Sequence, residues 1–156
     1  MKIVLAAINA KYIHSNLGVH SLKAYGEQEL AKRGRPDIRI EIGEYTINHQ
    51  TDHILQDIYK RKPDMVGFSC YIWNITYVRQ LAGDLVKVLP KVRIWLGGPE
   101  VSYDAETILA REPAVEGVMV GEGERTFAEL ILTLGQKEGR GGQGGLEDIS
   151  GIVFRD

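Results

Sequence analysis

The sequence has little cysteine, the residue that cross-links a chain through disulfides or metal sites. Among its 156 residues there is a single cysteine, Cys70. One cysteine forms no internal disulfide, and the sequence contains neither a CxxC pair for zinc nor a three-cysteine set for an iron–sulfur cluster. A chain of this length buries roughly 68–70% of the surface that its unfolded form exposes, so it needs neither disulfides nor a structural metal for stability. We therefore expect one domain with one core, in the reducing cytoplasm.

Long apolar runs and an excess of positive charge are also missing. The apolar run at the N-terminus is interrupted by Asn9 and Lys11, and no run reaches the ~20 residues that cross a bilayer. Lys and Arg number 19 against 21 Asp and Glu, a formal net charge of −2. The chain therefore lacks the excess of positive charge that binds the phosphate backbone of a nucleic acid. The sequence predicts neither a membrane nor a nucleic acid partner, and it does not indicate an oligomeric state.

Short apolar runs alternate with amphipathic stretches, which is typical of repeated βα units around a parallel sheet. The strands are expected at residues 2–8, 37–43, 64–70, 92–96 and 117–120, with a sixth candidate at 151–154. The helices are expected at residues 15–33, 51–61, 74–89, 102–111 and 123–137. In the third helix, Asn74 is a candidate N-cap, and Pro90 stops the apolar stripe.

The patterning of the first two strands indicates the order of the sheet. Residues 3–8 are continuously apolar, as in a strand covered on both faces, whereas Ile38-Arg-Ile-Glu-Ile42 alternates as an edge strand does. We therefore expect an α/β fold with a doubly wound parallel sheet in three αβα layers, flavodoxin-like or Rossmann-like, with strand order 2-1-3-4-5. The order 3-2-1-4-5 also fits this pattern.

Residues 138–147 hold five glycines, too many for a packed element, and are expected to form a flexible loop. This segment lacks the Lys-Ser/Thr of a P-loop, so we interpret it as a connector to the last strand. The chain then ends in a strand-like segment at 152–156. We expect residues 1–156 to be a single domain at the N-terminus of a longer protein.

Ligands of open parallel sheets bind at the carboxyl ends of the strands, and several common ligands are disfavoured there. Residues 9–18 contain one glycine, which argues against the GxGxxG loop of a dinucleotide fold. Ser69 and Cys70 stand where a receiver domain would carry an aspartate, and the sequence has no GxSxG elbow of a hydrolase.

The strand ends instead combine small residues with aromatic ones. Ser69, Gly97 and Gly98 remove bulk, while flat apolar surface with polar tips comes from Tyr12, Tyr71, Trp73 and Tyr103. Such a rim suits a large planar cofactor. Two plainer interpretations stay open: Gly97-Gly98 as a tight turn, which glycine alone favours, and Ser69 as a core residue with a satisfied hydroxyl.

Four segments together resemble the N-terminal cobalamin (vitamin B12)-binding domain of B12-dependent radical S-adenosylmethionine (SAM) enzymes. Each lies at a predicted strand end, and the resemblance covers nearly the whole chain. The segments are Asn9-Ala-Lys-Tyr-Ile-His-Ser-Asn-Leu17, Gly67-Phe-Ser-Cys-Tyr-Ile-Trp-Asn74, Leu96-Gly-Gly-Pro-Glu-Val-Ser102 and Gly121-Glu-Gly-Glu124.

The resemblance implies a set of cofactor-binding residues. Ser69, Gly97 and Gly98 would line the slot for the dimethylbenzimidazole tail, and the 121–124 element would approach the tail or the corrin amides. From the four segments the cofactor-binding candidates are Asn9, Tyr12, His14, Ser69, Tyr71, Gly97, Gly98, Pro99, Glu100, Gly121, Glu122, Gly123 and Glu124.

The histidines carry weaker signals. Domains of the methionine synthase type ligate cobalt through D-x-H-x-x-G, whereas here Tyr12 precedes His14 by two positions and the glycine lies one place too far along. His14 is the candidate cobalt ligand, but a hydrogen bond at a helix start or a semi-buried packing role outweighs ligation. No ligand spacing surrounds His20, His49 or His53, and Cys70 is expected to be buried and unreactive.

The leading hypothesis is a module that binds cobalamin and presents it to a C-terminal radical SAM domain of the same chain. That resemblance implies a methyltransferase or a cyclase-like enzyme in which SAM and a [4Fe-4S] cluster belong to the other domain, because this chain has no CxxxCxxC. On its own it is not expected to be an enzyme. The alternatives are a cofactor-free regulatory or interaction domain and a flavin or nucleotide binder.

Overall fold

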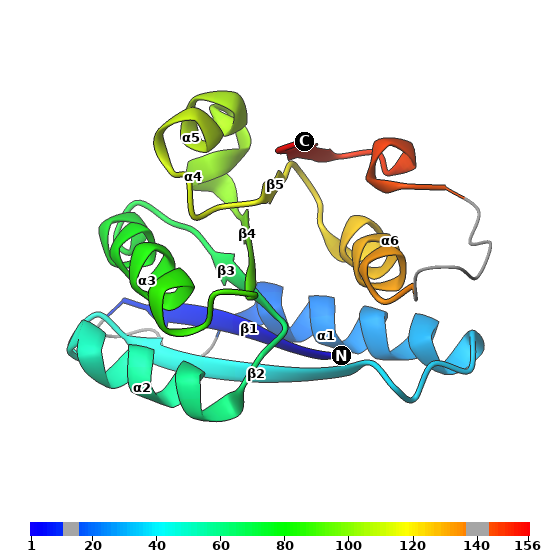
Figure 1. The fold of residues 1–156 in the computed structure, drawn as a ribbon, viewed down its shortest axis with the longest axis horizontal. Coiled ribbons are helices and arrows are strands. Elements are labelled where there is room, and N and C mark those ends of the chain that lie inside the picture. Colours follow the sequence, from blue (N-terminus) through cyan, green and yellow to red (C-terminus); the bar gives the residue numbers. More distant parts are fainter. Residues whose placement is uncertain (11–15, 137–143) are drawn as a thin grey trace.

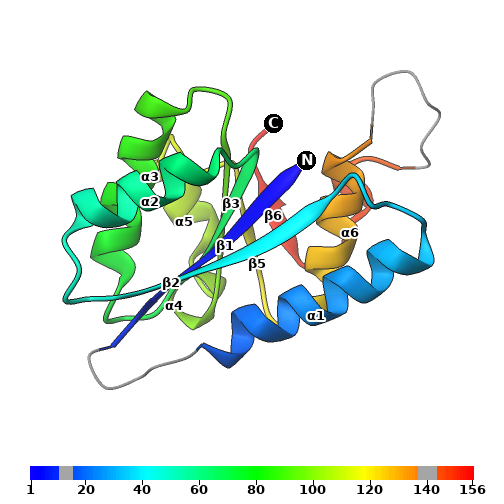
Figure 2. The ribbon, with the colours of Figure 1, turned by 90° about the horizontal axis from the view of Figure 1, so that it is seen from below.

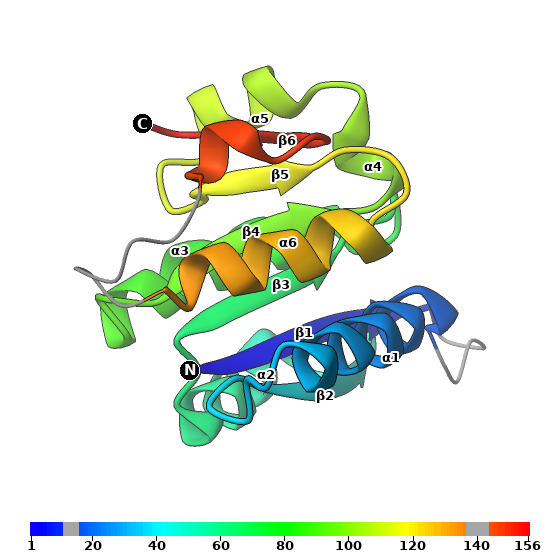
Figure 3. The ribbon, with the colours of Figure 1, turned by 90° about the vertical axis from the view of Figure 1, so that its right-hand side faces the viewer.

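The computed structural model describes residues 1–10, 16–136 and 144–156 (Figure 1). Six strands form one sheet in the order β2-β1-β3-β4-β5-β6, which Figure 3 shows from its α1 and α6 side. The first five strands are parallel, and β6 pairs antiparallel with β5. Their bounds are β1 Lys2–Asn9, β2 Arg39–Thr46, β3 Met65–Ser69, β4 Arg93–Gly97, β5 Gly117–Met119 and β6 Ile152–Phe154.

Helices cover both faces of the sheet, giving three layers (Figure 2). One face carries α1 (Leu17–Lys32) and α6 (Glu124–Leu134), which pack on each other. The other carries α2 (Thr51–Arg61) and α3 (Ile75–Val88), with α4 (Pro99–Ser102) and α5 (Ala105–Arg111) beyond them. A 3₁₀ turn, η1 (Leu146–Asp148), leads into β6.

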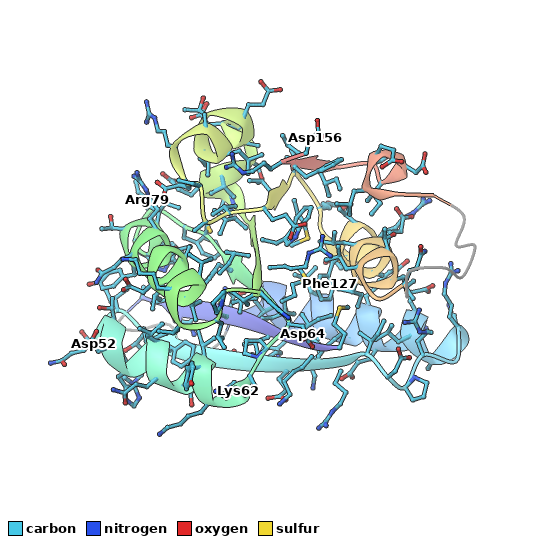
Figure 4. All side chains as sticks on the ribbon, viewed as in Figure 1. Asp52, Lys62, Asp64, Arg79, Phe127 and Asp156 are labelled. Atoms are coloured by element: carbon cyan, nitrogen blue, oxygen red, sulfur yellow. The ribbon has the colours of Figure 1, made fainter. Side chains whose placement is uncertain are left out.

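The position of β1 inside the sheet explains its unbroken apolar run. Ile3, Leu5 and Ala7 belong to the core under α1 and α6, whereas Ala6 and Ile8 belong to the core under α2 and α3. Both faces of the strand therefore lose contact with water, and apolar burial stabilises it from two sides. Phe127 of α6, labelled in Figure 4, is fully buried in the first of these cores.

The predicted fold class and the order 2-1-3-4-5 are confirmed, with the sixth strand added antiparallel beyond β5. The second strand runs on to Thr46, further than expected. Its odd-numbered residues face α2, and Tyr45 is buried there with its hydroxyl donating to Asp57 of that helix at 2.5 Å. Gly43 leaves space for this ring, because a β-carbon at that position would lie 2.6 Å from Tyr45 Oη.

The expected helix at 102–111 is wrong in its detail. The chain forms two short helices there, because Pro99 starts α4 early and the backbone leaves helical geometry at Asp104 (φ −120°, ψ 31°). Within the expected loop at 138–147, residues 138–143 lie outside the described part of the chain, and η1 includes Leu146 and Glu147. In the described residues, no helix has the length and apolar character to cross a membrane.

Candidate functional site

A cavity of about 140 Å³ opens at the carboxyl ends of the parallel strands. Its floor comes from β1, β3 and β4, and its walls come from the first turns of α1 and α6 and from the loops before α4 and α6. The lining residues are Leu5, Gly18, Val19, Leu22, Gly67, Phe68, Ser69, Tyr71, Gly97, Gly98, Met119, Gly121, Gly123 and Glu124. Most of these side chains are apolar or absent, so the cavity suits an apolar, flat group more than a highly charged one.

Gly97 leaves room on the cavity floor by having no side chain. A β-carbon placed on Gly97 would lie 3.5 Å from Met119 Cε, an ordinary contact, so the backbone tolerates a side chain at this position. Any longer side chain would extend into the cavity that Gly97 lines. The glycine at 97 therefore creates space in the way that the sequence predicts.

Gly98 also lines the cavity, but glycine is needed at this position for a different reason. Its φ is +105°, and a β-carbon would lie 2.5 Å from the carbonyl oxygen of Cys70. Positive φ and this close approach of two backbone segments both require glycine. The tight-turn interpretation therefore accounts for Gly98, whereas Gly97 is not required by the backbone and leaves the cavity open.

Ser69 ends β3 with its hydroxyl at the cavity. Its Oγ accepts a hydrogen bond of 3.3 Å from Asn16 Nδ2, and Asn16 in turn caps α1, because its Oδ1 accepts the amide of Val19 at 3.2 Å. Ser69 is half-buried and lines the cavity, so it is not an interior residue with its hydroxyl turned into the core.

The rim aromatics separate into two groups. Tyr71 lines the cavity and stacks on Trp73 with ring centroids 4.4 Å apart and planes 6° from parallel. The indole of Trp73 donates to the carbonyl of Ile8 at 3.2 Å, so its polar tip is used by the protein itself. Tyr103 is 93% exposed and does not line the cavity.

Asn74 holds the loop between β3 and α3 in place. The sequence predicts a helix N-cap here, but the side chain makes no cap hydrogen bond to α3. Its Oδ1 instead accepts the amide of Tyr71 at 2.8 Å, and its Nδ2 donates to the carbonyls of Ile8 and Ser69 at 3.1 and 2.9 Å. Asn74 is buried, and it ties the ends of β1 and β3 together beside the cavity.

Ser102 joins two further loops of the cavity. Its hydroxyl donates to the carbonyl of Gly98 at 2.8 Å and accepts the amide of Gly121 at 3.4 Å. Of the 121–124 element, Gly121, Gly123 and Glu124 line the cavity. Glu122 is exposed outside it.

The remaining candidates lie elsewhere. Asn9 is buried at the end of β1 and does not line the cavity. Pro99 is the first residue of α4, and Glu100 lines a separate hollow of about 200 Å³ between α3 and α5. Tyr12 and His14 lie outside the described residues, so their predicted contacts with the cofactor stay predictions.

Histidines do not build a metal centre in the described residues. His20 lies 2.7 Å from Glu44 through Nε2, and His49 Nδ1 accepts the amide of Thr46 at 2.9 Å. His53 stacks on His49 with centroids 5.3 Å apart. Over residues 1–10, 16–136 and 144–156, no group of three or more His, Cys, Asp or Glu side chains is placed to hold a metal ion.

Cys70 is buried directly behind the Gly98 turn, and we expect it to resist thiol reagents in the native protein. Burial raises the pKa of its thiol to about 12, so at pH 8 only about one thiol in ten thousand is ionised. Labelling with iodoacetamide should therefore follow global unfolding, with the native protein unmodified after hours at pH 8. Rapid native labelling would contradict this assignment.

The same shift has a consequence for stability in alkali. The thiol has a higher pKa folded than unfolded, so above pH 9 the unfolded state releases its proton first. Stability from this group is therefore intact below about pH 9 and falls between pH 9 and 12.

Sequence reasoning missed Asn16 and Ser102, which position the cavity walls, and Met119, which lines the cavity. None of the three was singled out as a candidate from the sequence. Asn16 stands immediately before an amphipathic stretch, which is a signal for an N-cap, but its second contact with Ser69 depends on how α1 lies over β3.

Comparison with known proteins places this geometry in a family. A family model described as a B12 binding domain matches residues 3–131. Over 72 residues the chain is 33% identical to the cobalamin-dependent radical SAM methyltransferase TokK of Streptomyces tokunonensis, covering 46% of this chain and 11% of TokK. It is 34% identical over 70 residues to 2-(S-pantetheinyl)-carbapenam-3-carboxylate methyltransferase of Streptantibioticus cattleyicolor, covering 45% of this chain and 10% of that protein. The chain thus spans about a tenth of the length of these relatives.

Solved structures show the same fold. The cobalamin-dependent SAM radical enzyme OxsB, with aqua-cobalamin and SAM bound, superposes with a TM-score of 0.72 at 18% identity, over 99% of this chain and 21% of OxsB. A cobalamin-binding protein from Desulfitobacterium hafniense DCB-2 gives 0.54 at 16% identity, over 84% of this chain and 57% of that protein. Because the family match runs from β1 into α6 and takes in every wall of the cavity, the chain belongs to the B12-binding domain family.

Proposed function

We propose that this chain binds cobalamin with the nucleotide tail in the cavity between α1 and α6 and the corrin over the carboxyl edge of the sheet. The observation that carries the proposal is the cavity itself, which has Gly67 and Gly97 in its floor within a member of the B12-binding domain family. A bicyclic aromatic base is flat and largely apolar, and most of the side chains that line the cavity are apolar or absent.

The residues around the cavity fit the parts of the tail. Val19, Leu22 and Met119 offer apolar contacts to the faces of the base, and the Ser69 hydroxyl offers a hydrogen bond to its edge. Gly121 and Gly123 bring backbone close to the phosphate and amide groups that follow the base. Bound there, cobalamin would supply a cobalt centre that carries and transfers a methyl group, and these residues of the chain would hold it.

We propose further that the corrin is presented to a radical SAM domain of the same protein, which supplies SAM and the [4Fe-4S] cluster. The names of the relatives support this, since they include a cobalamin-dependent radical SAM methyltransferase. The surface around the strand ends also supports it, because Leu17 and Ile72 there are 80% and 78% exposed, and Tyr103 is more exposed still. Methyl transfer is the reaction favoured by those names, with cyclisation as the second candidate.

Retention of hydroxocobalamin tests the cobalamin site directly. We expect purified protein mixed with hydroxocobalamin to leave a gel-filtration column coloured, with a shifted visible spectrum, because the protein retains the cofactor. Parallel samples receive FMN. Colourless protein after hydroxocobalamin, with FMN retained, would contradict the proposal and favour a flavin site.

A further inference from the structure

A hollow of about 320 Å³ lies at the amino ends of β3 and β4, at the edge of the sheet opposite the cavity described above. It is formed by the two connections that lead from α2 into β3 and from α3 into β4. Its lining residues are Pro63, Asp64, Leu89, Pro90, Lys91 and Val92. The two prolines offer ring surface and no amide donor, so the hollow is open and largely apolar.

Exposed apolar side chains flank this hollow on two sides. Tyr59, in the last turn of α2, is 39% exposed, and Val88, the last residue of α3, is 44% exposed. The other exposed large apolar side chains of the described residues belong to the carboxyl edge of the sheet. Apolar surface that gathers around a hollow is typical of a protein-binding site.

Four lysines surround the same hollow, and helix dipoles explain only two of them. Lys60 and Lys87 lie in the last turns of α2 and α3, where the negative end of the helix dipole favours a positive charge. Lys62 and Lys91 lie beyond the helix ends. Of the four, only Lys87 has an ion-pair partner within the described part of the chain, Asp84 at 4.0 Å. The border of the hollow is therefore positively charged.

Lys62 has a backbone conformation that costs free energy. Its φ is 52° and its ψ 54°, and among the described residues no other side-chain-bearing residue has a positive φ. Helix ends normally place glycine or asparagine in this left-handed region. The amine of Lys62 lies 3.5 Å from the centre of the Tyr59 ring, beside the hollow. A lysine here lowers stability, and backbone strain of this kind is typical of functional positions.

We propose that this hollow is a docking site for a protein partner whose binding segment carries carboxylates on both sides of an apolar side chain. The apolar side chain fills the hollow between Pro63 and Pro90, and the carboxylates face Lys62 on one border and Lys91 on the other. Complementary charge selects an acidic partner. Because the hollow and the cavity lie at opposite edges of the sheet, the partner and a ligand of the cavity can be bound together.

A nucleic acid or an anionic membrane fits these residues less well. The carboxylate of Asp64 lines the hollow itself, where it repels phosphate, and its Oδ2 is held there by the amide of Lys2 at 2.7 Å. Lys62 and Asp64 are both labelled in Figure 4. No arginine, the side chain that binds phosphate through paired hydrogen bonds, lines the hollow. These features favour separate carboxylates around an apolar group over a continuous line of phosphates.

The test uses three capped hexapeptides, EELFEE, QQLFQQ and EEAAEE, and follows binding by NMR through the amides of Asp64, Leu89 and Lys91. We expect EELFEE to shift these amides. Loss of its charges or of its apolar residues should weaken binding about tenfold. Raising NaCl from about 50 mM to about 500 mM should weaken EELFEE about fivefold and leave QQLFQQ unchanged.

Lys62→Asn separates a lysine needed for docking from one needed for the fold. Asparagine adopts the left-handed region more easily than lysine, so the variant should gain about 2 °C in Tm while its affinity for EELFEE falls about threefold. Lys62→Asn combined with Lys91→Gln should lose about tenfold. Lys32→Gln is the matched control, because it removes a lysine from the last turn of α1 at the same edge, and its affinity should be unchanged.

Several outcomes overturn the inference. They are the absence of shifts at these amides with EELFEE, equal binding of QQLFQQ, and undiminished affinity in the double variant. Tighter binding of oligo-dT or of phosphatidylserine vesicles at the same amides would replace the acidic protein with a phosphate-bearing partner. If Lys62→Asn does not fold, Lys91→Gln alone still decides, since Lys91 is exposed and unchanged affinity there would equally overturn the docking site.

Discussion

Gly97→Leu should abolish retention of hydroxocobalamin while the protein stays folded. A β-carbon at Gly97 makes only an ordinary contact with Met119, so the backbone of β4 need not move. The remaining leucine carbons extend into a cavity of about 140 Å³ and take the space of the tail base. Overfilling of this kind costs about 3 kcal/mol, which corresponds to a loss in affinity of at least about 100-fold.

The measurement is the dissociation constant for hydroxocobalamin, with circular dichroism to show that the fold is retained. Gly83→Leu is the matched control, because Gly83 lies in α3 on the other face of the sheet and a β-carbon there meets nothing within 4 Å. Gly98→Trp is a poor test by comparison, since it clashes with the backbone of Cys70. Undiminished affinity in folded Gly97→Leu protein would remove the cavity as the site of the tail.

Asn74→Ala should lower the free energy of unfolding by about 3–5 kcal/mol. The change removes three hydrogen bonds, so the amide of Tyr71 and the carbonyl of Ser69 lose this partner, while the carbonyl of Ile8 still accepts from the indole of Trp73. Each buried polar group that loses its partner costs about 1–3 kcal/mol. For a chain of this length the expected fall in Tm is about 10 °C.

Thermal unfolding of Asn74→Ala is compared with that of Asn48→Ala, where an exposed asparagine is truncated and the Tm should change by less than about 2 °C. The Tyr71–Trp73 stack reports on the loop itself, and its indole fluorescence should shift toward the value of solvated tryptophan. Equal Tm values for the two variants would show that Asn74 does not tie β1 to β3 as its contacts indicate.

Sequence patterning predicts most of the fold because a strand buried on both faces has a continuous apolar run, whereas one buried on a single face alternates apolar and polar residues. The unbroken run in β1 and the alternation in β2 place these strands next to each other with β2 at the edge, as the structure has them. The pattern fails at residues 102–111, where Tyr103 and Asp104 separate two short helices and Asp104 leaves helical geometry. Backbone angles at a single position leave no periodic trace.

The candidate site is predictable in place and less so in detail. Parallel strands bring their carboxyl ends to one edge, so Ser69, Gly97 and the 121–124 element meet there as the motifs indicate. The contacts and exposures of individual site residues depend on distances between segments that are far apart in the sequence. The approach of Cys70 to Gly98, the amide of Asn16 over Ser69 and the exposure of Tyr103 all depend on how helices lie on the sheet, and no local pattern encodes that.

The two borders of the sheet also bear on how the protein behaves when concentrated. On one side the sheet ends in β6, which is only three residues long. On the other it ends in β2, where Glu41 is engaged by Lys2 and Arg61 and the neighbouring Arg39 and Glu44 add charge. A very short strand at one border and a charged strand at the other both discourage strand addition from a second molecule, so polymerisation through edge-to-edge pairing is disfavoured.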